Sequence, residues 1–268
     1  MSSNRLRVLL VSLLAVFAVS AVASASSASA FNLQWDVCET GTKGVEPPTK
    51  FDDHGCSTKA KPLAEREWEW KILAATETRK VISNIKPGTT FVLKALNIVV
   101  TCKSATDTGT ITGGTPGTDE TTVTYDECTT SIAGCKVKSA TKPAGEILVS
   151  NIKTKLVEGE TKAGVKVVAD EFFKAGEFVT LEFGEVEKGT PPTSTLEKAC
   201  PKIPLTTKVT GKIYAIAQEP GLPLIGLLKF PTGGLKTPVN TLNVFGVGAE
   251  LTGEEQQTLE NGWAVTAI

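Results

Sequence analysis

Four pairs of adjacent acidic residues could carry out acid–base chemistry in this chain of 268 residues. The pairs are Asp119-Glu120, Asp126-Glu127, Asp170-Glu171 and Glu254-Glu255. Glycoside hydrolysis needs two carboxyl groups that flank the scissile bond across a cleft. Since neighbours on a β-strand point to opposite faces of the sheet, no adjacent pair is such a dyad by itself. Acids from different strands could converge, so the sequence leaves open a carboxylate-dependent hydrolase acting on polysaccharide.

The only histidine, His54, follows Asp52 and Asp53, and a Ser-His-Asp triad would have to include it. The sequence has no G-x-S-x-G nucleophile elbow, and the composition around His54 is typical of a polar surface turn. The glycine-rich segment 108–119 lacks the G-K-S/T ending of a phosphate-binding loop and predicts a hairpin turn. The H-E-x-x-H, EF-hand and paired C-x₂₋₄-C patterns of metal sites are missing as well. We therefore expect no catalytic residue, no metal and no cofactor.

Two of the four tryptophans, Trp68 and Trp70, form a candidate ligand face. The segment 67–72 alternates strictly between polar and apolar residues, which would place both rings on one face of a strand. Such a pair suits stacking against the sugar rings of a cell-wall polymer. Core packing is the alternative, because large aromatic side chains in β proteins mostly fill the interior.

The six cysteines form an even set, which favours disulfides in an exported chain. Six cysteines allow fifteen connectivities, and loop composition suggests one of them. A Cys128–Cys135 bridge would close a short loop, and a Cys38–Cys56 bridge would clip a Gly/Pro-rich stretch. These two bridges leave Cys102 to pair with Cys200.

Residues 1–30 have the three parts of a secretory signal peptide. Two arginines provide the positive n-region, residues 8–23 form the apolar h-region, and Ala28-Ser29-Ala30 fits the A-x-A cleavage rule. The h-region, about 16 residues long, is shorter than the roughly 20 residues that span a bilayer. We expect a secreted, extracellular product with no integral membrane segment after cleavage.

The rest of the chain predicts an all-β fold. Ten or so short segments show strand patterning between turn signals, and the 36 threonines suit the solvated face of a sheet. We expect a disulfide-stabilised antiparallel β-sandwich or barrel-like domain over residues 64–268, after a loop-rich lead-in at 31–63. Residues 64–82 are compatible with either strand or helix, and 218–241 predicts a Pro/Gly-rich loop before a C-terminal hairpin.

Several motifs carry a family resemblance. They are VTC at 100–102, TVTYDEC at 122–128, GCKVKS at 134–139, AGEILVSNIKTKLVEG at 144–159 and TKVTGKIYAIA at 207–217. In order and spacing the chain resembles uncharacterised secreted, cysteine-containing proteins of high-GC Gram-positive bacteria. The likeness covers roughly residues 90–217 and departs at Ser150, where that family has threonine. It implies an all-β, disulfide-tied fold and assigns no activity.

Composition narrows the function classes further. The chain has 28 Lys and Arg residues against 29 Asp and Glu residues, so no sequence-wide basic field exists for binding nucleic acid. We expect a secreted or surface-associated, non-catalytic binding or structural protein whose partner is a cell-wall polymer or another surface protein. The alternatives are the polysaccharide hydrolase above and an inhibitor-like protein that engages a partner protein.

Overall fold

The computed structural model describes residues 31–41, 51–62, 65–190, 194–219 and 226–268. The predicted signal peptide, residues 1–30, lies outside the described residues. Within the described part of the chain, no helix has the length and apolar character that a membrane span requires.

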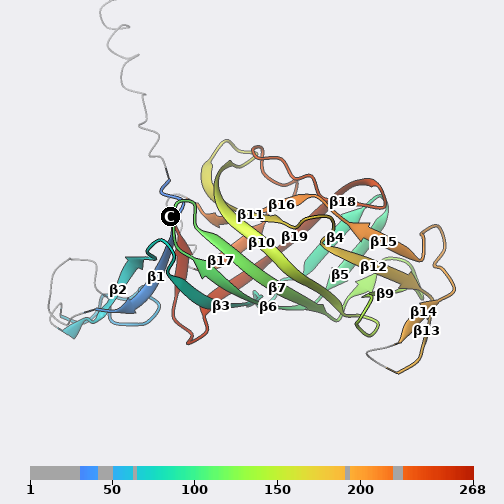
Figure 1. Ribbon diagram of the computed structural model, residues 1–268, viewed down its shortest axis with the longest axis horizontal. Coiled ribbons are helices and arrows are strands. Elements are labelled where there is room, and N and C mark those ends of the chain that lie inside the picture. Colours follow the sequence, from blue (N-terminus) through green and yellow to red (C-terminus); the bar gives the residue numbers. More distant parts are fainter. Residues whose placement is uncertain (1–30, 42–50, 63–64, 191–193, 220–225) are drawn as a thin grey trace, which may run out of the picture. The chain divides into compact units, whose positions relative to one another are not determined.

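Eight antiparallel strands close into a barrel (Figure 1). In order around the barrel they are β3 (Thr78–Ile85), β6 (Ser104–Thr112), β7 (Thr118–Asp126), β10 (Ile147–Glu160), β11 (Lys166–Phe173), β16 (Lys212–Gln218), β17 (Leu227–Phe230) and β19 (Val247–Leu259). Strand β17 pairs with both β16 and β19, and β19 pairs with β3, which completes the ring. The all-β prediction is confirmed, and of its two alternatives the barrel is correct.

Further strands extend the barrel wall or form small sheets beside it. The wall continues from β19 through β4 (Phe91–Ala95), β5 (Ile98–Cys102) and β8 (Thr129–Thr130), while β18 (Asn243–Val244) pairs with β19. A three-stranded sheet contains β15 (Thr206–Val209), β12 (Val179–Gly184) and β9 (Lys136–Ser139). Another contains β2 (Trp68–Ile72), β1 (Trp35–Thr40) and β20 (Val265–Ala267), and a hairpin joins β13 (Val186–Lys188) to β14 (Thr195–Glu197).

Three sequence predictions about the strands need correction. The helical alternative for 64–82 is wrong, because β2 and the first part of β3 lie there. Residues 90–102, whose β-branched and aromatic run predicts one buried strand bent near 95–97, form a hairpin of β4 and β5 that turns at Leu96 with a positive φ of 53°. The sequence also missed most of β19, because polar residues occupy inward positions of this strand and obscure its alternation.

The predicted loops at 31–63 and 218–241 also contain strands. Strand β1 lies in the first segment and pairs with β20 at the far end of the chain, a contact that local composition could not show. Strand β17 lies in the second segment and closes the barrel, while residues 220–225 are outside the described part.

All six cysteines form disulfides, and one predicted pair, Cys38–Cys56, is confirmed. The other bridges are Cys102–Cys128 and Cys135–Cys200, so the predicted pairs Cys128–Cys135 and Cys102–Cys200 are wrong. The reason lies in strand pairing. Strand β8 follows Cys128 and pairs with the end of β5, which brings the Cα atoms of Cys102 and Cys128 to 4.0 Å. Three disulfides fit an oxidising, extracellular environment.

Candidate functional site

Three of the four adjacent acid pairs have one side chain on each face of the barrel wall because successive strand residues alternate. These pairs are Asp119-Glu120, Asp170-Glu171 and Glu254-Glu255. Glu171 faces outward, where its Oε1 accepts a hydrogen bond of 2.6 Å from Lys212 Nζ. Glu254 also faces outward, with its Oε2 2.7 Å from Lys86 Nζ. The other member of each pair therefore points into the barrel.

The barrel interior holds four carboxyl groups, which we call the inner carboxyls. They are Asp107 of β6, Asp119 of β7, Asp170 of β11 and Glu255 of β19, and their exposed fractions are 2%, 6%, 1% and 3%. Register places them on one inner surface: Asp107 lies opposite Val123, Asp119 is four residues before Val123, and Asp170 is two residues before Phe172. None of the four forms an ion pair with a described Lys, Arg or His. Acids from four strands thus lie in one interior, where no described basic side chain pairs with them.

Two of the inner carboxyls accept hydrogen bonds from nearby groups. The Thr121 hydroxyl donates to Asp107 Oδ1, and the Thr110 backbone N–H donates to Asp119 Oδ1 over 3.1 Å. Gly109 makes room for this arrangement, since a Cβ atom there would lie 2.9 Å from both Asp119 Oδ1 and Thr121 Oγ1.

Other polar atoms inside the barrel have no hydrogen-bond partner. They are Asp170 Oδ1, Thr154 Oγ1 and Ser83 Oγ, and each of the three residues is only 1% exposed. Thr154 lies opposite Asp119 in the register, and Ser83 lies opposite Asp107. Buried polar atoms are nearly always hydrogen-bonded, so three such atoms in one interior are unusual.

Burial makes the inner carboxyls weak acids. It raises the pKa of Asp107 to about 6, and burial followed by the charge of Asp107 raises the pKa of Asp170 to about 7. Burial, and then the other inner carboxyls, holds the pKa values of Asp119 and Glu255 well above their usual range. Desolvation and like charge both disfavour the ionised form, so these groups retain protons at a pH where surface acids have lost them.

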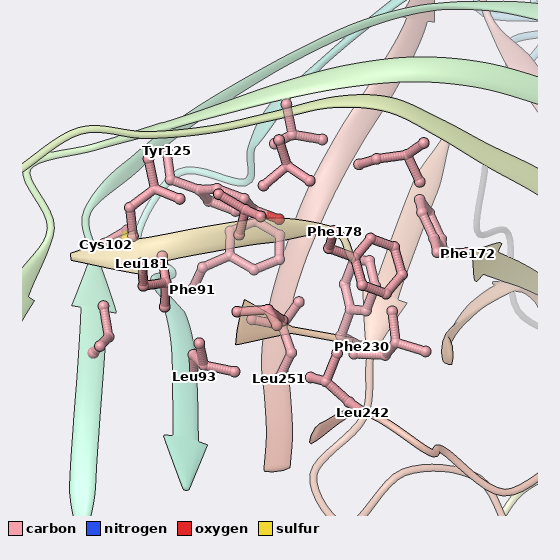
Figure 2. A pocket seen from close by; sticks show the side chains of 18 of the residues that line it. Phe91, Leu93, Cys102, Tyr125, Phe172, Phe178, Leu181, Phe230, Leu242 and Leu251 are labelled. Atoms are coloured by element: carbon pink, nitrogen blue, oxygen red, sulfur yellow. The ribbon is translucent and has the colours of Figure 1, made fainter. Parts of the chain in front are cut away.

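An apolar cavity of about 90 Å³ is lined in part by Glu255, one of the inner carboxyls. Figure 2 shows side chains that line this cavity, with Phe91, Tyr125, Phe172 and Phe230 among those labelled. Four aromatic rings line it in a chain, with centroid distances of 5.3 Å for Tyr125–Phe91, 5.6 Å for Phe91–Phe230 and 5.3 Å for Phe230–Phe172. Among the described lining residues Glu255 alone is charged. The remaining lining is aliphatic, aromatic or sulfur-containing: Leu93, Val100, Cys102, Val123, Ile147, Val149, Ile152, Phe178, Val179, Leu181, Val209, Ile213, Leu242 and Leu251.

Trp35 fills the barrel interior on the side away from this cavity. Its side chain is 1% exposed, and its Nε1–H donates a hydrogen bond of 3.2 Å to the carbonyl of Thr118. Gly117 lets the indole approach, because a Cβ atom at that position would lie 2.6 Å from Trp35 Cδ1 and 3.3 Å from a methyl group of Leu156. Leu156 pairs with Asp170, and Phe172, two residues after Asp170, lines the cavity, so Asp170 lies along β11 between the level of Trp35 and that of the cavity.

The predicted ligand face, Trp68 and Trp70, lies on β2 in the small sheet with β1 and β20. Trp70 is opposite Cys38 in the register, and both indoles are half-buried against the Cys38–Cys56 disulfide. The ring of Trp68 also meets that of Trp263 edge to face at 4.9 Å. The two tryptophans share a face as predicted, and part of each ring covers the disulfide.

The Asp52-Asp53-His54 segment forms the surface turn that its composition indicates. Asp53 Oδ2 accepts a hydrogen bond from the Thr58 backbone N–H over 3.0 Å, and the ring of the exposed His54 lies 6.0 Å from that of Trp68. Nowhere in the described ranges do three or more His, Cys, Asp or Glu residues form a group suited to a metal ion.

Sequence reasoning singled out Asp119, Asp170 and Glu255 as members of pairs but missed Asp107. The signal was present in the segment SATDTGTIT, where Ala105 and Ile111 mark the inward positions and Asp107 shares their parity. A polar residue at an inward position of an alternating strand is the pattern that would have identified it.

Comparisons with protein-family models, curated proteins and solved structures find no match for this chain. The resemblance to secreted proteins of high-GC Gram-positive bacteria therefore stays a prediction.

Proposed function

We propose that this chain is an exported, non-catalytic binding protein whose barrel takes up the apolar part of a small ligand. The predicted signal peptide and the three disulfides support the exported location. The apolar cavity carries the proposal, because an interior space lined by hydrophobic side chains with few polar groups is the usual form of a small-molecule site.

Binding fits the geometry better than hydrolysis of a polymer. A glycosidase must bring two carboxyl groups into contact with a chain of sugars, whereas the inner carboxyls are at least 94% buried inside a closed barrel. The cavity is also small and apolar, which matches a short hydrocarbon group rather than a sugar. A cell-wall polymer or a surface protein as a further partner stays a prediction of the sequence.

Titration of the purified protein with butan-1-ol tests the proposal. Chemical shifts of the methyl groups that line the cavity, Val149 and Leu251 among them, are expected to move in a saturable manner with a millimolar Kd. Such a Kd is reasonable for a ligand of five heavy atoms.

Two neighbouring substitutions provide the specificity control. Val149→Phe places a ring in the cavity and is expected to abolish saturable binding, whereas Leu148→Phe changes the adjacent residue, which does not line the cavity. Linear shifts without saturation, or equal binding by both variants, would contradict the proposal.

A further inference from the structure

The apolar cavity meets the inner carboxyls at Glu255. This residue lines the cavity, and its pKa is raised by burial and then by Asp107, Asp170 and Asp119, so all four acids share one electrostatic environment. Charges interact strongly in a water-poor interior, and no described basic side chain pairs with any of the four. A cation that reached Glu255 would be attracted by each inner carboxyl that is ionised.

Glu255 carries the inference by its position, because it is 3% exposed and lines the apolar cavity. No described Lys, Arg or His forms an ion pair with it. An ionised carboxylate is an acceptor alone, whereas an ammonium group carries three donors. A donor with a positive charge inside the cavity would therefore complement Glu255.

We propose that the ligand of the apolar cavity is a small aliphatic amine in its protonated form. The ammonium group lies at Glu255, and the hydrocarbon chain lies among Phe91, Phe230 and Phe172. This inference rests on the proposed function and adds the chemical class of the ligand. Where Glu255 is ionised, an anionic ligand of equal size, such as a short carboxylate, would meet like charge.

Affinity for an amine depends on the ionisation of Glu255. The titratable groups that face it are Asp107 on β6, Asp119 and Tyr125 on β7, and Asp170 on β11. Its strand neighbours β3 and β17 place the apolar residues Ile85 and Leu228 opposite it. Because the pKa of Glu255 is raised, pairing its carboxylate with an ammonium group releases the proton that Glu255 would otherwise hold, and affinity for an amine rises with pH.

Three ligands of matched size test the proposal: butylamine, butan-1-ol and butyrate, each titrated at pH 5.5 and pH 8 by the same methyl shifts. At pH 8 we expect butylamine to bind about tenfold more tightly than butan-1-ol, as a charge-assisted hydrogen bond implies, and butyrate to bind least tightly. At pH 5.5 the advantage of butylamine over butan-1-ol shrinks.

Paired variants test whether Glu255 is responsible for the preference for butylamine. Glu255→Gln is expected to remove the preference for butylamine while butan-1-ol still binds, which also reports that the variant is folded. Glu254→Gln changes the outward neighbour, which pairs with Lys86, and is expected to keep the preference.

Failure of the amine proposal and failure of the proposed function give different results in this experiment. If butan-1-ol binds and butylamine binds no more tightly at either pH, the amine proposal is overturned and the proposed function stands. If none of the three ligands saturates, the proposed function itself fails. Should Glu255→Gln not fold, the pH dependence of the wild-type preference decides the matter.

Discussion

At the scale of single residues, the unusual feature is a set of acids placed where water is scarce. Asp170 is the clearest case, because it is 1% exposed, has an oxygen without a hydrogen-bond partner and carries a pKa raised to about 7. Its neighbour Glu171 is nearly as buried but pairs with Lys212 and Lys155. Two consecutive acids thus have opposite electrostatic roles because successive strand residues face opposite sides.

Replacing Asp170 with asparagine should stabilise the protein at alkaline pH. At pH 8 the folded chain must hold an ionised carboxylate in the interior, and Asp170→Asn removes this cost, raising the free energy of unfolding by about 2–4 kcal/mol. At pH 4 both the native carboxyl and the amide are neutral, and the difference should be small. Urea unfolding at the two pH values measures the effect.

Glu120→Gln is the control for this substitution, since it changes an exposed acid and is expected to alter stability by less than about 0.5 kcal/mol. An Asp170→Asn variant that is less stable than the wild type at pH 8 would argue against a charge cost at this position.

At the scale of elements, a glycine in one barrel strand makes room for polar side chains of the neighbouring strand. Strand β6 has glycine at position 109, where Asp119 and Thr121 of β7 approach the backbone. The glycine is therefore part of the wall that supports the inner carboxyls rather than a turn residue. The same strand contributes Asp107, so β6 both carries one acid and makes room for another.

The substitution Gly109→Ala tests this role of β6. The added Cβ atom would lie 2.9 Å from two oxygen atoms and 3.0 Å from the Glu120 carbonyl, so the wall must shift. We expect a loss of about 1–3 kcal/mol in the free energy of unfolding, as overpacking of a well-filled interior causes.

Gly248→Ala is the matched control on β19. A Cβ atom at Gly248 would meet no atom within 4 Å, so the free energy of unfolding should stay within about 0.5 kcal/mol of the wild type. Equal losses in the two variants would show that strand glycines in general, rather than the contact with Asp119 and Thr121, determine the effect.

At the scale of the whole molecule, the inner carboxyls link stability to pH. Each has a higher pKa folded than unfolded, so the folded state binds more protons between the two values, and stability falls as pH rises through them. The folded-state pKa values of Asp107 and Asp170 place this decline in stability between about pH 4 and pH 7. Surface acids such as Glu160, whose pKa is lowered by its hydrogen bond to Lys236, act in the opposite direction at lower pH.

Thermal unfolding from pH 5 to pH 8 should therefore show a Tm that decreases steadily, in contrast to the stability maximum that many proteins have within this range. The double variant Asp107→Asn with Asp170→Asn should flatten the decrease. A wild-type Tm that is constant or rises over this range would show that the inner carboxyls are not buried acids in solution.

The sequence by itself was sufficient for features that depend on local pattern. Alternation predicted an all-β chain and gave a strand at Trp68 and Trp70 as one alternative beside a helix, and the even number of cysteines predicted disulfides. The sequence also showed that adjacent acids such as Asp119 and Glu120 face opposite sides of a strand, because this follows from backbone geometry alone.

Which strands are neighbours follows from the packing of the whole chain, and everything specific to the site depends on that pairing. The pairing of β5 with β8 set the Cys102–Cys128 bridge, and the pairing of β17 with β19 turned a sheet into a barrel. Closure brought Asp107, Asp119, Asp170 and Glu255 from four strands to one interior. Contacts between residues distant in the chain are set by the packing of whole strands, so no local pattern could contain them.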